Sequence, residues 1–227
     1  MTRPTNFLLA QLPEADVEAV LRHATRVQLR LGEDLVTPGD PIVWAYFVTE
    51  GVISTVNELS DGRSVEAFMV GPEGMAGIEA ATIPMQTASR QTIQVKGEAW
   101  RLETARLRTL TLERPALREA LARYHAGVQR ELEQTAACHA LHHAERRLAK
   151  WLLRVHDRVE GEVIKLTQEY MAAMLGSQRT TVNEAAQQLQ AQGAVRYSRG
   201  VLHVLDRPAL EAAACECYRK VVEPLAA

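Results

Sequence analysis

The sequence predicts an α+β protein with an N-terminal antiparallel β-barrel or β-roll, a long helix and a C-terminal winged helix-turn-helix. Short β-prone runs separated by turn residues fill residues 27–102. An apolar stripe with steps of three or four residues follows from about residue 115. A helical segment with an internal glycine then precedes two β-prone runs. The expected domains are the roll with an N-terminal helix at 1–112, the long helix and a hinge at 113–143, and the winged helix with an extra C-terminal helix at 144–227.

Composition excludes several classes of protein. The 227 residues are 47% hydrophobic and 24% charged, which is ordinary for a soluble globular protein. A formal net charge of −2 argues against a protein that coats nucleic acid indiscriminately. No apolar run reaches about 18 residues, so we expect no membrane-spanning helix. We find no phosphate loop, nucleophile elbow or paired metal-ligand motif, and we therefore expect no enzyme.

The roll is expected between residues 27 and 102, after a short helix over 13–24. Turn residues such as Pro38-Gly39-Asp40 and Glu50-Gly51 separate the β-prone runs. We expect Glu50-Gly51 to separate two strands, and we expect two further strands at the end of the series. These four runs are Trp44–Val48, Val52–Val56, Gln91–Val95 and Ala99–Leu102.

The segment Leu166–Leu189 predicts a helix-turn-helix. Thr167 is a candidate N-cap, and Gly176 stands where a sharp turn between helices often needs positive φ. The second helix would begin near Ser177 or Gln178, with its first turns exposed, as in a recognition helix that touches base edges. An ordinary helical hairpin is the alternative. The runs Val195–Tyr197 and Val201–Leu205, which follow as a hairpin, favour a winged helix and hence DNA binding.

The apolar stripe of the long helix has two interpretations, packing against its own domain or pairing with a copy of itself. We favour pairing in a homodimer, because a reader of two half-sites needs a dimer axis. The stripe consists of Leu117, Leu121, Tyr124, Val128, Leu132 and Thr135.

The order of these elements resembles the Crp/Fnr (catabolite activator / fumarate-nitrate regulator) family. The resemblance covers about Pro13 to Leu205, and its most specific parts are Pro38-Gly39-Asp40, Glu50-Gly51 and the Leu166–Leu189 block. It implies that the N-terminal domain is a double-stranded β-roll of the cyclic-nucleotide-binding-like type. It also implies a homodimeric, cytoplasmic, bacterial transcription regulator with a palindromic operator and contact with RNA polymerase. A ligand-binding signalling module that acts by protein–protein contact is the competing hypothesis.

By position, the resemblance assigns DNA-contacting roles to residues of the helix-turn-helix. The implied phosphate-facing residues are Thr167, Gln168, Gln178 and Thr181, and the implied base-reading residues are Arg179, Thr180 and Glu184. Asn183 is a further candidate, as an adenine reader. Arg179 can donate to guanine O6 and N7 together. Thr180 stands where the family usually has glutamate, so the operator sequence cannot be taken from the family.

The implied effector pocket departs from the family pattern. Nucleotide-binding members carry a Gly-Glu pair and, about ten residues later, an Arg-Ser pair. Here Gly77 is followed by Ile78, and the later pair is reversed as Ser89-Arg90. The candidate pocket residues are Gly77, Glu79, Ser89 and Arg90, with Arg90 as a phosphate partner and Glu79 as a ribose partner. We expect a different small ligand, or none, ahead of a cyclic nucleotide, and we predict no cofactor.

Cysteine and histidine residues near the end of the long helix raise the question of a metal. Cys138, His139, His142 and His143 are zinc- or iron-ligand types. We prefer a polar hinge without metal. We expect the C-terminal helix over Asp206–Leu225, with Asp206 as its N-cap. Cys215 and Cys217, two apart on this helix, should point in different directions. Three cysteines cannot supply an iron–sulfur cluster within one chain, and their small number fits a reducing cytoplasm.

Overall fold

A computed structural model describes residues 6–222, with side chains described up to Arg219, and confirms the predicted α+β fold. The chain divides into two units. Unit 1 comprises Met1–Asn57 and Phe68–Arg130, and unit 2 comprises Glu58–Ala67 and Glu131–Ala227. Within the described residues, no helix is both long and apolar enough to cross a membrane.

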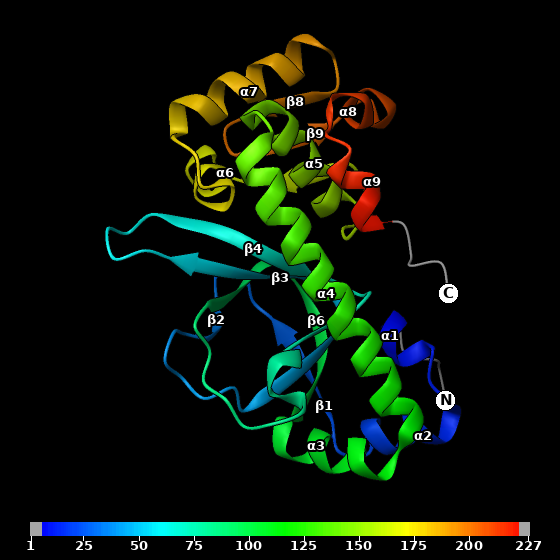
Figure 1. Ribbon diagram of the computed structural model, residues 1–227. Coiled ribbons are helices and arrows are strands. Elements are labelled where there is room, and N and C mark those ends of the chain that lie inside the picture. The colour runs from blue at the N-terminus through cyan, green and yellow to red at the C-terminus, as the bar shows by residue number, and fades with distance from the viewer. Residues whose placement is uncertain (1–5, 223–227) are drawn as a thin grey trace. The chain divides into compact units, whose positions relative to one another are not determined.

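Unit 1 is built around an antiparallel sheet with the strand order β1-β6-β3-β4, in which β2 pairs with β6 and β5 pairs with β3 (Figure 1). Its strands are β1 (Thr25–Leu29), β2 (Asp34–Val36), β3 (Trp44–Glu58) except for its last residue, the end of β4 (Ser64–Val70) from Phe68 onward, β5 (Met75–Ala76) and β6 (Arg90–Glu103). Its helices are α1 (Phe7–Ala10), α2 (Glu14–Leu21), the 3-10 helix η1 (Ile78–Ala81), α3 (Thr104–Glu113) and the first part of α4 (Pro115–Leu141).

The prediction that Glu50-Gly51 separates two strands is wrong. Strand β3 runs through this pair, and β6 likewise joins the two runs expected at the end of the series. The β3–β6 register shifts around Glu50, as in a β-bulge. A Cβ atom on Gly97 of β6 would lie 2.0 Å from the backbone oxygen of Glu50, and Gly51 has φ 91°. The glycines therefore mark a bulge with close backbone approach, which local sequence does not distinguish from a turn.

The first half of the predicted dimer stripe lies in the core of unit 1. Leu117 and Leu121 are buried with residues of α1, α2, α3 and β3. The hydroxyl of Tyr124 donates a 2.9 Å hydrogen bond to the backbone oxygen of Met75. These three residues therefore pack against their own roll, which was the alternative interpretation of the stripe. The later members Val128, Leu132 and Thr135 are half-exposed.

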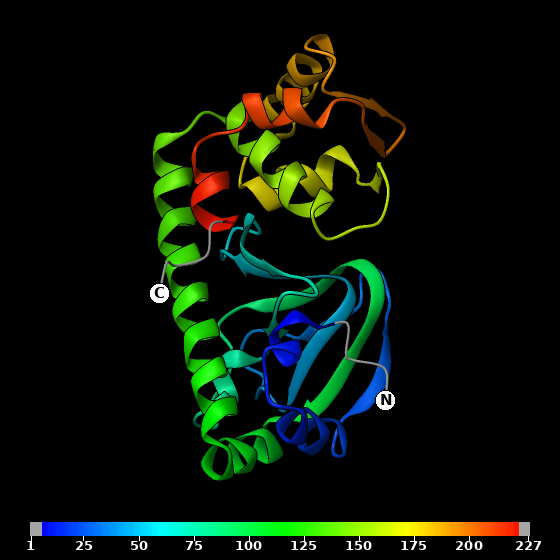
Figure 2. The ribbon, with the colours of Figure 1, turned by 90° about the vertical axis from the view of Figure 1, so that its right-hand side faces the viewer.

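Unit 2 contains the rest of α4 and a three-stranded sheet with the order β7-β9-β8. Figure 2 shows this part of the chain from a second side. Its other helices are α5 (Ala144–His156), α6 (Gln168–Leu175), α7 (Arg179–Ala191), α8 (Arg207–Ala213) and α9 (Cys217–Val222). Its strands are β7 (Val163–Lys165), β8 (Val195–Ser198) and β9 (Val201–Val204).

The single C-terminal helix expected after the wing is in fact two helices. Asp206 caps α8 as predicted, because its side chain accepts a hydrogen bond from the Ala209 N–H. The helix ends at Ala214, whose backbone is extended, and α9 begins at Cys217. Residues 223–225 of the predicted helix lie outside the described residues.

Candidate DNA-binding surface

Helix α6 begins and ends where the sequence predicts. The Thr167 hydroxyl accepts a 3.1 Å hydrogen bond from the Tyr170 N–H, so Thr167 is the N-cap. Met171, Met174 and Leu175 are buried on the inner face. Gly176 closes the helix in the left-handed conformation, with φ 57°. The turn to α7 is therefore fixed by local chemistry at both ends of α6.

Arg147 of α5 also holds the turn between α6 and α7. Its guanidinium donates to the backbone oxygen of Leu175 at 3.1 Å and to the Ser177 hydroxyl at 2.8 Å. Arg146, Arg147 and Lys150 of the same helix are basic residues that could either contact phosphates or cover the solvent side of the helix. Lys150 is buried and does neither, and Arg147 is engaged with the turn. Only Arg146 of the three is exposed.

The first two turns of helix α7 expose polar side chains to solvent, and the opposite face of the helix is buried. Val182, Ala185, Ala186 and Leu189 are all buried. Gln178, Arg179, Thr180 and Glu184 are exposed, and Thr181 and Asn183 are half-exposed. Within the described residues, Arg179 and Glu184 form no ion pair with each other. The guanidinium of Arg179 is therefore free to contact an external acceptor.

A hydrogen bond joins the two helices on this surface. Gln168 Nε2, at the start of α6, donates to Asn183 Oδ1 at 2.6 Å. Both side chains are half-buried, and the bond fixes the position of the Asn183 amide. Two of the predicted DNA-contacting residues are thus brought together, although they are fifteen positions apart in the sequence.

The wing is the hairpin formed by β8 and β9. Arg199 and Gly200 make its turn with φ values of 49° and 78°. The Tyr197 hydroxyl donates to the Leu166 backbone oxygen at 3.1 Å and so connects the wing to the start of the helix-turn-helix. Arg196 and Arg199 are exposed on the hairpin. These two arginines are candidate phosphate contacts that were not predicted, although two arginines beside a tight glycine turn are a usable signal in the sequence.

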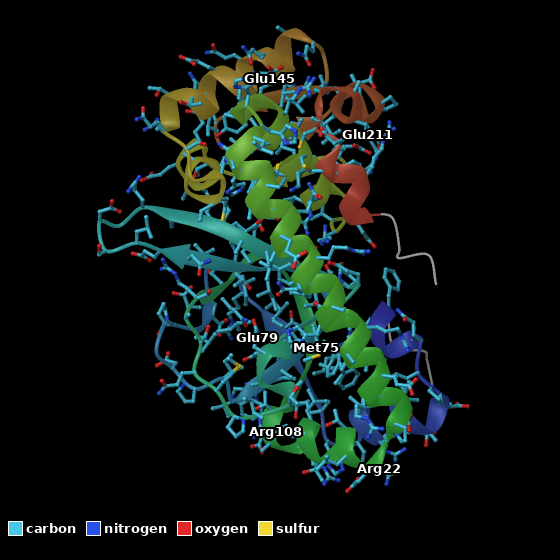
Figure 3. The ribbon with its side chains drawn as sticks, in the orientation of Figure 1. Arg22, Met75, Glu79, Arg108, Glu145 and Glu211 are labelled. Carbon is cyan, nitrogen blue, oxygen red and sulfur yellow. The ribbon has the colours of Figure 1, made fainter. Side chains whose placement is uncertain are left out.

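In unit 1, the predicted effector-pocket residues occupy different elements. Gly77, with φ 82°, precedes η1, and Glu79 lies within it (Figure 3). Glu79 Oε2 is buried without a hydrogen-bond partner in the described chain. Ser89 donates to Asn57 Oδ1 at 2.6 Å, and Arg90 Nη1 lies 3.9 Å from Asp34 Oδ2. Both polar side chains of the later pair therefore already have partners within unit 1.

The residue that replaces the family's glutamate, Ile78, is a core residue. It is only 5% exposed and packs in the same cluster as Leu117 and Leu121. A cavity of about 280 Å³ nearby in unit 1 is lined by Leu35, Val36, Asp40, Pro41, Ile42, Val43, Trp44, Tyr46 and Gln91. None of the four predicted pocket residues belongs to this lining.

The cysteine and histidine residues fall into two groups. Cys138, His142, Cys215 and Cys217 converge within unit 2, whereas His139 and His143 are not part of this group. Burial and the nearby positive charges of Arg147 and Lys150 lower the pKa of His139 to about 4, so that it is neutral at physiological pH.

Comparison with known proteins places unit 2 in a known domain family. Residues 146–213 match the Crp-like helix-turn-helix domain. The chain is also 26% identical, over 187 residues, to a CRP-like cAMP-activated global transcriptional regulator of Mycobacterium tuberculosis. This alignment covers 79% of the chain and 84% of the relative.

Solved structures of similar fold extend the likeness to both units. FixK2 of Bradyrhizobium japonicum matches with a TM-score of 0.72 at 22% identity, over 85% of this chain and 98% of that one. The c-di-GMP responsive global regulator CLP of Xanthomonas campestris matches with a TM-score of 0.70 at 19% identity, over 85% and 99%. At these identities the likeness establishes the fold.

Proposed function

Because the chain belongs to the Crp/Fnr family of transcription regulators, we propose that it binds a palindromic operator as a homodimer. Its relatives are DNA-binding regulators and not enzymes. The observation that carries the proposal is the exposed start of α7, supported from behind by buried residues and by Arg147. A rigid helix with a free polar N-terminal face is the form in which this motif enters the major groove.

The proposed base contacts come from four residues of α7. Arg179 would donate to O6 and N7 of a guanine, a contact that contributes about 1–3 kcal/mol of discrimination. Thr180 and Glu184 are exposed beside it, and Asn183 stands at the edge of the surface. Glu184 would accept from a cytosine amine. The reading of each half-site thus depends first on Arg179.

The proposed phosphate contacts surround this face. Thr167, Gln168, Gln178 and Thr181 would bind the backbone of the DNA, with Arg196 and Arg199 of the wing in addition. Such contacts position the helix and make affinity strongly dependent on salt. They carry no sequence information of their own.

The homodimer is proposed to form along α4, beyond the turns that pack on the roll. Val128 and Leu132 are half-exposed there, whereas the hydroxyl of Thr135 is buried and Thr135 lines a small cavity of unit 2. In a twofold dimer of this kind, two recognition helices lie about 34 Å apart, one turn of B-DNA. We propose that the DNA-bound dimer contacts RNA polymerase. We also propose that the protein acts in the bacterial cytoplasm.

Unit 1 is proposed to serve as the sensor. The relative from Mycobacterium tuberculosis is activated by cAMP. In this chain Ser89 and Arg90 already contact Asn57 and Asp34, and Ile78 is buried in the core. These contacts favour a ligand other than cAMP. Thermal unfolding with a panel of nucleotides tests this, because a ligand of the native state raises the midpoint. A midpoint raised by cAMP and lost in Arg90→Ala would restore Gly77, Glu79, Ser89 and Arg90 as a nucleotide pocket.

Selection of bound fragments from random duplex DNA tests the operator and the dimer together. We expect a motif with twofold symmetry. Fluorescence anisotropy with that motif should show affinity falling steeply with salt, and Arg179→Ala should lose about 5- to 150-fold in preference over a mismatched site. Gln188→Ala, exposed on a later turn of α7, is the matched control and should bind normally.

Two results would count against the proposal. Absence of salt-dependent DNA binding would favour the competing hypothesis, a signalling module acting through protein contacts. A selected motif without symmetry, together with a monomeric mass in light scattering, would exclude the dimeric mode of reading.

A further inference from the structure

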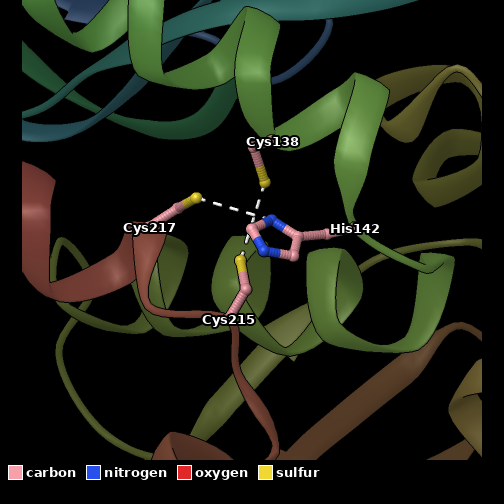
Figure 4. Close-up of side chains that lie close together, drawn as sticks. All are labelled: Cys138, His142, Cys215 and Cys217. Carbon is pink, nitrogen blue, oxygen red and sulfur yellow. Dashed lines mark hydrogen bonds between the residues drawn. The ribbon is translucent and has the colours of Figure 1, made fainter.

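We propose that Cys138, His142, Cys215 and Cys217 together bind one zinc ion. The four ligand atoms all lie within 4.8 Å of one another, in unit 2 (Figure 4). Three thiols and one imidazole form a donor set typical of structural zinc sites. The site is separate from the DNA-binding surface of α6 and α7, and its evidence does not depend on the proposed function.

Two distances between the ligand atoms fit a single tetrahedral ion. Cys138 Sγ lies 3.6 Å from Cys215 Sγ, and Cys217 Sγ lies 3.5 Å from His142 Nδ1. Zinc bonds of about 2.3 Å to sulfur and 2.0–2.1 Å to nitrogen give tetrahedral edges of about 3.8 Å between sulfurs and about 3.6 Å between sulfur and nitrogen. The two measured edges match these values closely. An iron–sulfur cluster instead needs its thiolates spread over several irons.

Two segments of the chain supply the ligands. Cys138 lies in the last turn of α4, and His142 directly follows the helix. The His142 N–H donates to the Cys138 backbone oxygen at 3.1 Å, so the helical turn continues and the two residues share one face. Cys215 lies in the extended link after α8, and Cys217 is the first residue of α9. Because these two cysteines are not on one continuous helix, both side chains can reach the same point.

Neighbouring side chains hold the ligands in position. While His142 Nδ1 faces the sulfurs, its Nε2 lies 3.2 Å from Glu216 Oε2. A ligating histidine usually gives its second N–H to a carboxylate in this way, which fixes the tautomer and orients the ring. Gln134 Nε2 donates to Cys217 Sγ at 2.9 Å. The three cysteines are 1–2% exposed, so their thiols are shielded from solvent.

Charge supports the same assignment. Lys150 is 5% exposed and lines the same small cavity as Cys138, together with Arg147, Arg154 and one buried carboxylate, that of Glu66. A buried ammonium group is unfavourable unless a negative charge lies near it. Zinc with three thiolates and a neutral imidazole has a net charge of −1, which is opposite to that of Lys150.

Metal content and cobalt substitution test the proposal on the full chain without a histidine tag. We expect about one zinc per chain by mass spectrometry after purification under reducing conditions. Cobalt added to the metal-free chain should give the intense visible bands of a tetrahedral thiolate complex, saturating at one equivalent. Competition with a chromophoric chelator then gives the zinc affinity.

Variants identify the ligands. Cys217→Ser and His142→Gln should each lose at least about 100-fold in zinc affinity, and Glu216→Gln about 10- to 100-fold. His143→Gln, exposed and adjacent to His142, is the matched control and should bind zinc as the wild type does. Zinc should raise the unfolding midpoint of the wild type and of the control, but not that of Cys217→Ser.

Three results would overturn the proposal: no zinc or cobalt binding by the reduced wild-type chain, unchanged affinity in both ligand variants, or a Cys138–Cys215 disulfide in protein alkylated directly from reducing cells. If a ligand variant fails to fold, thiol alkylation of the wild type decides. Zinc must then protect all three cysteines, and reaction of any of them at the metal-free rate refutes the site.

Discussion

Replacing Arg147 with methionine tests whether α5 holds the helix-turn-helix in place. Arg147 donates to the Leu175 backbone oxygen and to the Ser177 hydroxyl, at 3.1 and 2.8 Å. A hydrogen bond from a charged donor contributes about 1.5–3 kcal/mol, and a buried acceptor left unpaired costs about 1–3 kcal/mol. Methionine keeps most of the apolar stem of the side chain. We therefore expect the free energy of unfolding of unit 2 to fall by about 2–4 kcal/mol.

The assay must report on unit 2 alone. The chain has three tryptophans, and a background with Trp44→Phe and Trp100→Phe leaves Trp151 of α5 as the only one. Urea unfolding followed by its fluorescence should then reflect α5 and its neighbours. With a slope of about 2 kcal/mol per molar urea, the midpoint should fall by about 1–2 M.

Arg146→Met is the control for Arg147→Met. Arg146 is the adjacent residue of the same helix and is exposed, so its replacement should change the midpoint little. Equal midpoints for the two variants would refute the reasoning. The turn would then be held by the left-handed glycine and the packed faces of α6 and α7 without help from α5.

Three further predictions concern unit 1. Gly97→Ala should unfold the roll or destabilise it by more than about 3 kcal/mol in urea titration, because its Cβ would lie 2.0 Å from the Glu50 oxygen. Leu117→Ala, at 0% exposure, should cost about 2–5 kcal/mol of unfolding free energy, whereas Leu112→Ala, at 79% exposure, should cost little. Hydrogen bonds from Gln28 and then Arg26 lower the pKa of Glu98. The resulting stability is present above the unfolded value and lost as pH falls through the folded pKa, so the urea midpoints of wild type and Glu98→Gln should converge in acid.

The helix-turn-helix was predictable because its signals are local. The Thr167 hydroxyl caps the helix that follows it within three residues, and Gly176 turns the chain at its own position. The inner stripe of α7 repeats with the helical period over a few turns. Each of these features is decided by neighbours in sequence, so no knowledge of distant contacts was needed.

The roll was predictable as a class but not in its register. Whether Glu50-Gly51 is a turn or a bulge depends on Gly97, which is more than forty residues away. A glycine permits positive φ in both cases. The same limit applies to Leu117, whose periodicity is equally suited to a partner helix or to its own roll.

The cluster of cysteines was missed for a related reason. Reading Asp206 to Leu225 as one helix placed Cys215 and Cys217 on different faces. The extended backbone at Ala214 removes that restriction. Only the tertiary structure brings Cys215 and Cys217 next to Cys138 and His142. The spacing of the four residues in the sequence does not match a motif that would predict a metal site.

The hydrogen bond between Gln168 and Asn183 bears on how the chain would read DNA. Paired recognition of adenine needs the Asn oxygen as acceptor and the Asn nitrogen as donor. Here the oxygen of Asn183 already accepts from Gln168 at 2.6 Å. Reading adenine would require that oxygen to share its second lone pair or to give up the bond between the helices. Within the described residues, the side chains of Arg179 and Glu184 form no hydrogen bond or ion pair of this kind. Direct reading of bases should therefore rest on these exposed residues, with Asn183 acting first to position α6 against α7.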